Sequence, residues 1–191
     1  VINNISYTNK MIINGNVVNA SKTYKFTSTG ENEIYFAINE DSQLTNLYRL
    51  FYNCSYMTHV DMTHIDMSLA TSTSATSGTA LLFEGCANLK SIILPESISH
   101  IGYRMFMYCR EVESLTIKAH QAPILYDNYS FGYGSGSYLG CMYADNGTNK
   151  LYVPIGSDGY DSGGWVSMLQ NTSYCGFTKV ELSEEELNLI Q

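Results

Sequence analysis

Apolar residues in the middle of this 191-residue chain recur in a fixed order. Segments 50–62, 82–94 and 105–117 align without gaps and share the pattern F-x-x-C-x-x-Φ-x-x-Φ-x-Φ, where Φ is an apolar residue. Agreement in five columns over three copies indicates an internal repeat. The five columns are Phe51, Phe83 and Phe106; Cys54, Cys86 and Cys109; Met57, Leu89 and Val112; Val60, Ile92 and Leu115; and Met62, Leu94 and Ile117.

The spacing within each copy predicts its local structure. The closing Φ-x-Φ alternates with period two, which is typical of a short strand with both apolar residues on one face. The opening stretch has a period of three to four, as in Leu47, Leu50, Phe51 and Cys54, and predicts one helical or 3-10 turn. One copy cannot bury its apolar side alone, so the copies are expected to stack on one another.

Further segments with the same strand pattern lie on both sides of the three copies, at Ile34–Phe36, Leu151–Val153 and Val180–Leu182. Two stretches interrupt the repeat, a Ser/Thr/Ala/Gly-rich loop at 68–80 and a Tyr-rich insertion at 124–150. Insertions in repeat arrays map to loops, so neither is expected to break the stacking.

Both ends of a stack need a cover, because an open end would expose the core to water. Near the C-terminus, Ser162 is expected to cap a helix that carries Trp165 and Leu169, and Ser183 with Glu186 has the spacing of a capping box. The Asn-rich N-terminus predicts short strands joined by turns, at Met11–Ile13 and Tyr24–Phe26. The predicted organisation is an N-terminal β cap at 1–30, a repeat array at 31–182 and a C-terminal helical tail at 183–191.

The second copy carries a family resemblance. Its run F-E-G-C-A-N-L-K-S-I-I-L-P-E-S-I-S-H-I-G, from Phe83 to Gly102, resembles the BspA-type leucine-rich repeat of bacterial cell-surface proteins. The resemblance extends over residues 30–182. It implies an α/β leucine-rich-repeat solenoid, strand-dominated, with short helical or 3-10 turns and a cap at each end. It also implies a bacterial protein at the cell surface or secreted, with a role in adhesion and host contact.

Charge and composition exclude several classes of function. A net charge of −8 and a pI near 4.8 argue against nucleic-acid binding, which needs a basic surface. The chain has no apolar run of the roughly 18–20 residues that cross a membrane. Because it starts at Val1 without a leader, we take it as a processed protein or part of a longer one, with any signal or anchor elsewhere.

The sequence offers no convincing catalytic, cofactor or metal site, so we expect a protein that is not an enzyme and needs no cofactor. The five cysteines have no zinc-site spacing, and the three in the repeat are expected to be buried and reduced. The sequence leaves open whether Cys141 and Cys175 pair. His59, Asp61, His64 and Asp66 lie close in sequence, but an exposed polar strand edge explains them better than a metal centre does.

A ligand surface is predicted on the face of the sheet that points away from the core. The residue between the two inward positions of each strand faces that side, and this column comprises Tyr35, Asp61, Ile93, Thr116 and Tyr152. The Tyr-rich insertion has the Tyr, Ser, Gly and Asn composition of binding loops, although a packing flap would have it too. Its candidate residues are Tyr126, Tyr129, Tyr133, Tyr138 and Tyr143.

Three functions remain open. The first is a non-enzymatic interaction module that binds a host or matrix protein through the solenoid surface. The second is a carbohydrate-binding module that uses the Tyr-rich loop, and the third is a structural spacer. A broad, nearly uncharged surface suits a protein or glycan ligand better than it suits chemistry.

Overall fold

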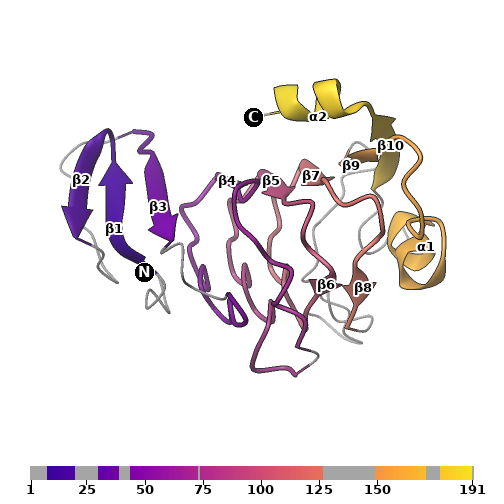
Figure 1. Cartoon of the computed structure of the whole chain (residues 1–191), viewed down its shortest axis with the longest axis horizontal. Helices are drawn as coiled ribbons and strands as arrows, with labels where there is room; N and C mark the ends of the chain where they lie inside the picture. Colours follow the sequence, from indigo (N-terminus) through magenta and orange to yellow (C-terminus); the bar gives the residue numbers. More distant parts are fainter. Residues whose placement is uncertain are drawn as a thin grey trace.

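The computed structural model describes residues 8–19, 30–38, 44–72, 74–126, 149–170 and 177–190. The repeat copies build a five-stranded parallel sheet in the order β10-β9-β7-β5-β4 (Figure 1). Its strands are β4 (His59–Asp61), β5 (Ser91–Leu94), β7 (Ser114–Ile117), β9 (Lys150–Pro154) and β10 (Thr178–Leu182). The segments predicted as outer strands at 151–153 and 180–182 therefore join the same sheet as the three copies.

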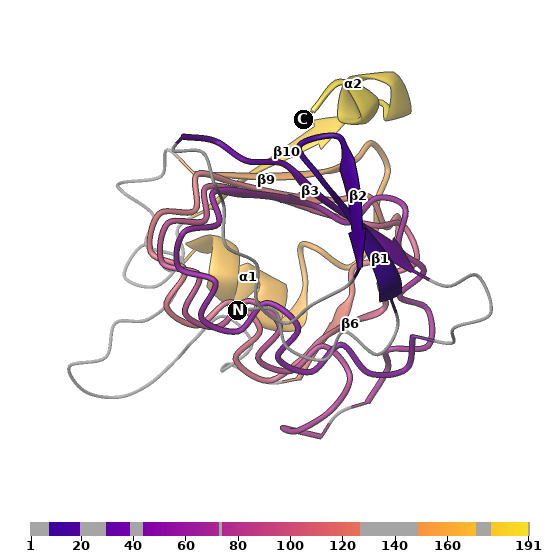
Figure 2. The ribbon, with the colours of Figure 1, turned by 90° about the vertical axis from the view of Figure 1, so that its left-hand side faces the viewer.

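Residues that share a column in the alignment of the copies pair with one another in the sheet. Val60 pairs with Ile92, Ile92 with Leu115, and Leu115 with Leu151. Ile92, Leu94, Leu115 and Ile117 are fully buried in one core, as the period-two pattern predicts. Viewed along the stack, the coils lie over one another (Figure 2).

The opening turn of each copy is not the helical turn that its spacing suggests. Hydrogen bonds from residue i to i−3 are present, as in a 3-10 helix, for example from Leu50 N–H to the Leu47 carbonyl. The residues two before and two after each repeat phenylalanine, however, have positive φ, which breaks any helix. These residues are Arg49 and Asn53, Leu81 and Gly85, and Arg104 and Tyr108.

These turns form a second ladder of backbone hydrogen bonds on the side of the stack away from the sheet. The N–H groups of Leu47, Arg49, Phe51 and Asn53 donate at 2.7–3.3 Å to carbonyls at the start of the second copy and just before it, those of Gly78, Ala80, Leu82 and Glu84. Leu81, Phe83 and Gly85 donate in the same way to the third copy, at 2.8–2.9 Å. Alternate residues donate within their own turn instead, so the turn backbone is satisfied both within and between copies.

The phenylalanine and cysteine columns stack inside the array. The Phe83 ring lies parallel to those of Phe51 and Phe106, with centroids 5.6 and 5.7 Å apart. The Cys86 thiol donates to the Phe51 carbonyl, and the Cys109 thiol to the Phe83 carbonyl, each at 3.1 Å. The cysteine column therefore ties each copy to the preceding one, which explains why a small, weakly polar residue recurs there.

The three repeat cysteines are unbonded to one another, but only Cys86 and Cys109 are buried. The expectation that Cys54 is buried is wrong, because it belongs to the first copy and is half-buried at the end of the column. Cys141 and Cys175 lie outside the described residues.

We expect Cys86 and Cys109 to resist maleimide in the native protein, while Cys54 reacts slowly. Burial raises the pKa of Cys86 to about 12 and that of Cys109 well above its ordinary value, and the thiolate is the reactive form. Peptide mass spectrometry after labelling measures each site, with denatured protein as the control in which all three react. Rapid native labelling of Cys86 would contradict the buried column.

The N-terminal strands form a separate antiparallel sheet in the order β2-β1-β3. It contains β1 (Thr8–Ile13), β2 (Asn16–Asn19) and β3 (Ile34–Ile38). Asn14 and Gly15 have φ of 48° and 80°, which a type I′ hairpin turn requires. The segment at 34–36 is a strand as predicted, but it pairs with β1 and not with β4. Residues 24–26, also predicted as a strand, lie outside the described residues.

The array continues at its C-terminal end into β8 and the first helix. Strands β6 (His100–Ile101) and β8 (Ile124–Leu125) pair in parallel on the side away from the large sheet (Figure 1). Helix α1 (Gly163–Gln170) carries Trp165, which is buried in the core against the Tyr160 ring. Ser162 precedes this helix as expected, but its hydroxyl donates back to the Gly159 carbonyl, 3.0 Å away.

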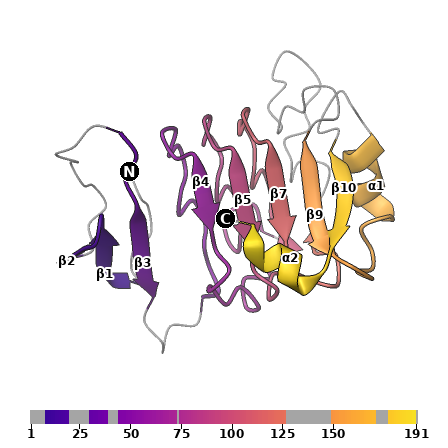
Figure 3. The ribbon, with the colours of Figure 1, turned by 90° about the horizontal axis from the view of Figure 1, so that it is seen from above.

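The last helix lies on the outer face of the large sheet, the face opposite the core. Helix α2 (Glu184–Leu189) has the predicted capping box, in which Glu186 N–H donates to Ser183 Oγ and Ser183 N–H donates to the Glu186 carboxylate. From β10 it runs back over β9 and β7 toward β5 (Figures 1 and 3). Leu187 is its buried residue.

Candidate functional site

The predicted column is split into an exposed part and a covered part. Tyr35 is 58% exposed and Asp61 is exposed, at the N-terminal side of the molecule. Ile93 and Thr116 lie outside the core cluster, as their outward register requires, but are only 2% and 0% exposed. The expectation that these two face solvent is wrong. Tyr152 is half-buried.

Helix α2 provides the cover that sequence reasoning missed. It packs against β9 and β10, and Lys118, just after β7, donates from Nζ to Asn188 Oδ1 at 3.0 Å. His120 Nε2 lies 4.0 Å from Glu184 Oε1 at the start of the helix. The signal was present in the sequence, since the capping box was recognised and Leu187 is apolar, but nothing local indicates on which surface a short helix docks.

The Tyr-rich insertion does not extend this column in the part that the structure describes. Tyr129, Tyr133, Tyr138 and Tyr143 lie outside the described residues. Tyr126 follows β8 and is 37% exposed, with its ring edge-on to Tyr103 at 5.6 Å. Because β8 lies away from the large sheet, Tyr126 is not beside the column (Figure 1).

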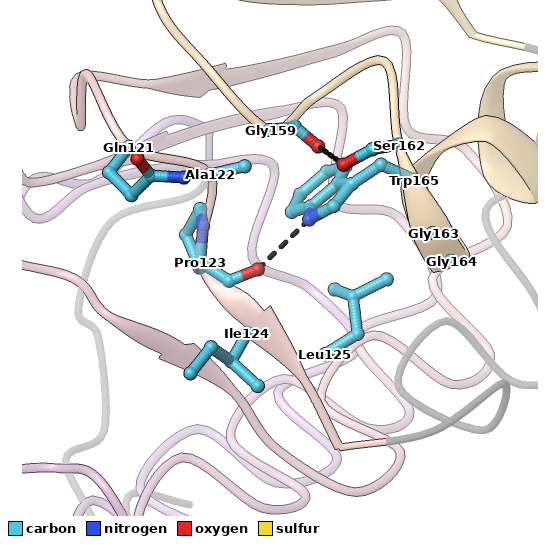
Figure 4. A pocket seen from close by; sticks show the side chains of 10 residues that line it. All are labelled: Gln121, Ala122, Pro123, Ile124, Leu125, Gly159, Ser162, Gly163, Gly164 and Trp165. Atoms are coloured by element: carbon cyan, nitrogen blue, oxygen red, sulfur yellow. Dashed lines mark hydrogen bonds between the residues drawn. The ribbon is translucent and has the colours of Figure 1, made fainter.

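An open pocket of about 370 Å³ lies between the segment before β8 and the start of α1 (Figure 4). The Trp165 indole N–H donates to the Pro123 carbonyl at 2.9 Å and joins the two walls. The lining residues are Gln121, Ala122, Pro123, Ile124, Leu125, Gly159, Ser162, Gly163, Gly164 and Trp165. Since none of these residues is ionisable, the pocket has no side chain suited to acid–base catalysis.

In the cluster of His59, Asp61, His64 and Asp66 near β4, both carboxylates accept hydrogen bonds within local backbone turns. Asp61 Oδ1 accepts from Thr63 N–H at 2.8 Å, and Asp66 Oδ1 accepts from Ser68 N–H at 2.9 Å. The hydrogen bonds from Ser68 lower the pKa of Asp66. Among the described residues, no three His, Cys, Asp or Glu side chains come together as a metal site would require. Neither helix in that part of the chain is long and apolar enough to cross a membrane.

A polar surface that sequence reasoning missed lies on the turn ladder. We call it the turn face and define it as the outward side chains of residues 48–53, 80–85 and 103–108. Arg49 lies over the rings of Tyr48 and Tyr52, with its guanidinium carbon 5.1 and 4.7 Å from their centroids. Arg104 lies over Tyr103 at 4.9 Å. Alignment of the copies by Phe51, Phe83 and Phe106 places Tyr48 with Tyr103 and Arg49 with Arg104, a signal that was available in the sequence.

Comparison with known families gives a match in the middle of the chain. Residues 68–136 match the model described as "BspA type Leucine rich repeat region (6 copies)". Comparison with curated proteins and with solved structures gave no match. Residues 68–136 of this chain are therefore similar to the BspA-type leucine-rich-repeat family.

Proposed function

We propose that the chain is a non-enzymatic interaction module, at the cell surface or secreted, that binds a host or matrix protein. The family match supports this class of function. We further infer that the copies form one leucine-rich-repeat solenoid, with the N-terminal strands as one cap and the segment from α1 onward as the other. The edge-on contact of Phe36 in β3 with Phe51 in the first copy, at 5.7 Å, supports the N-terminal cap.

The observation that carries the proposed binding surface is the exposure of Tyr35 and Asp61. Tyr35 is 58% exposed on β3, although a tyrosine can bury a large area at low entropic cost. Helix α2 covers the equivalent positions farther along the array, which leaves the N-terminal part of the predicted column as its accessible part. Interface hot spots are enriched in tyrosine, which supports a protein contact at this position.

We expect Tyr35→Ala to weaken binding to a matrix protein about tenfold or more, a loss typical of a hot spot. Asp61→Asn keeps the acceptor for Thr63 N–H and removes only the charge, so it tests the electrostatic contribution alone. The measurement is biolayer interferometry against a panel of immobilised matrix glycoproteins and collagens.

Tyr126→Ala is the matched control, because it removes a partly exposed tyrosine on the side away from the large sheet. It should leave protein affinity within twofold of the wild-type value. Equal affinity of wild type, Tyr35→Ala and Asp61→Asn would place the contact elsewhere, and binding to no panel member would favour a structural spacer.

A further inference from the structure

The turn face has an acidic centre that the packing of the array does not explain. Glu84 belongs to the middle copy and is 8% exposed. Glu84 is electrostatically coupled to Arg104 of the third copy and to Arg49 of the first, and neither forms an ion pair with it in the described part of the chain. Burial raises the pKa of Glu84, and the two guanidinium groups, Arg104 more than Arg49, act against that rise.

Two polar atoms of this centre lack hydrogen-bond partners. Glu84 Oε2, an acceptor, and Arg104 Nε, a donor, are both buried and unpaired among the described residues. A buried polar group without a partner costs about 1–3 kcal/mol, and more when it is charged. Native proteins keep few such groups, and those that persist need an explanation. The centre thus holds an acceptor and a donor without protein partners in one electrostatically coupled group.

The middle copy differs from its neighbours on this face. At the position three before the repeat phenylalanine, the flanking copies have Tyr48 and Tyr103, whereas the middle copy has Ala80. At the position two after it, the middle copy has Gly85, and the third copy has Tyr108. Short side chains in the middle copy thus leave Glu84 between two aromatic and cationic rows.

Both arginines occupy a strained backbone position. Arg49 and Arg104 have φ of 58° and 50°, in the left-handed region that glycine or asparagine occupies most readily. A non-glycine residue in such a region costs of order 1–3 kcal/mol, and this cost is found most often at binding and catalytic sites. Leu81 has φ of 57° at the same position of the middle copy, so this strain belongs to the turn of every copy, and it is the flanking copies that place a guanidinium there.

We propose that the turn face binds a neutral sugar residue of a glycan, centred on Glu84 and Arg104. A hydroxyl is both a donor and an acceptor, so neighbouring hydroxyls of one sugar can donate to the Glu84 carboxylate and accept from the Arg104 guanidinium. Tyr48, Tyr52 and Tyr103 are half-buried beside these arginines and would contact the sugar ring. An anionic ligand would meet Glu84, and a cationic one would meet Arg49 and Arg104, which favours a neutral ligand. This site is separate from Tyr35 and Asp61.

The test is isothermal titration of the chain with four probes: maltotriose, chitotriose, lactose and the acidic 3′-sialyllactose. We expect at least one neutral probe to bind, and Glu84→Gln and Arg104→Gln each to weaken its binding at least tenfold. Arg110→Gln and Glu113→Gln remove an arginine and a glutamate that are exposed outside the centre, and should change affinity less than twofold.

Thermal unfolding of the same variants separates binding from folding. Glu84→Gln removes a buried unpaired charge, so its melting temperature should equal or exceed that of the wild type. If the melting temperature of Glu84→Gln is lowered instead, its sugar affinity is set aside, and the sugar affinity of Arg104→Gln tests the proposal. The proposal is overturned if no neutral probe binds, if sialyllactose binds best, or if both variants bind as the wild type does. Tyr35→Ala should leave sugar affinity unchanged, so failure here is distinguishable from failure of the proposed protein contact.

Discussion

Replacing Phe83 by alanine is expected to lower the free energy of unfolding by about 3–5 kcal/mol. Phe83 is fully buried, and its ring is the middle member of the stack formed with Phe51 and Phe106. The flanking rings belong to different copies whose backbones are held by the turn ladder, so they cannot collapse into the cavity without breaking hydrogen bonds between copies. Urea unfolding followed by circular dichroism measures the loss.

Phe36→Ala is the matched control for this variant. Phe36 contacts the same stack at its N-terminal end but is only partly buried, so its loss should cost clearly less than that of Phe83. Equal costs for the two would mean that the phenylalanine column does not act as the continuous core of the repeat.

Gly102→Ala is expected to cost about 3 kcal/mol or more, at the upper end of what overpacking costs. A Cβ at this position would lie 2.6 Å from the backbone nitrogen of Ala80 and 2.9 Å from the carbonyl carbon of Thr79. These are backbone atoms of the adjacent coil, so no side-chain rotation relieves the contact. The Gly102 N–H also donates to Thr79 Oγ1 at 2.8 Å, and Thr79 Oγ1 donates to the His100 carbonyl, a hydrogen-bonded chain that needs the two coils in close approach.

Gly156→Ala provides the comparison. Gly156 has φ of 71°, but nothing lies within 4 Å of the Cβ that would be added. Its replacement therefore costs only the strain of a left-handed alanine, about 1 kcal/mol. If differential scanning calorimetry gave similar melting temperatures for the two variants, the close approach of the coils at Gly102 would not matter for stability.

The strands could be predicted from the sequence because alternation with period two determines which side chains share a face. Ile92 and Leu94 were placed on the core side by that argument alone, and the pairing of β5 with β7 follows the alignment of the copies. The turns could not be predicted in the same way. A period of three to four fits a helix and also fits a turn that alternates between right- and left-handed residues. Among the six positive-φ positions only Asn53 and Gly85 have residue types that favour this conformation, and they do not recur in the third copy.

The candidate sites depended on contacts between distant segments, which local patterns do not report. The sequence placed Ile93 and Thr116 correctly on the face away from the core, but α2 determines how much of that face is exposed. Asn188 of α2 lies 70 residues after Lys118, the residue with which it forms a hydrogen bond. Glu84 was overlooked for a similar reason. A single glutamate in a repeat has no motif, and its significance arises only from its burial and from the arginines that adjacent copies supply.

The turn ladder also gives the array an electrical direction. Every hydrogen bond between copies in it runs the same way, from an N–H of one copy to a carbonyl of the next. Peptide dipoles aligned in this way add, as they do in a helix. The end of the ladder at the first copy therefore carries partial negative charge, and the end at the third copy carries partial positive charge. A copy added before the first must supply N–H groups, and a copy added after the third must supply carbonyls. Two such arrays can therefore extend each other through this ladder only head to tail, and never through a two-fold axis.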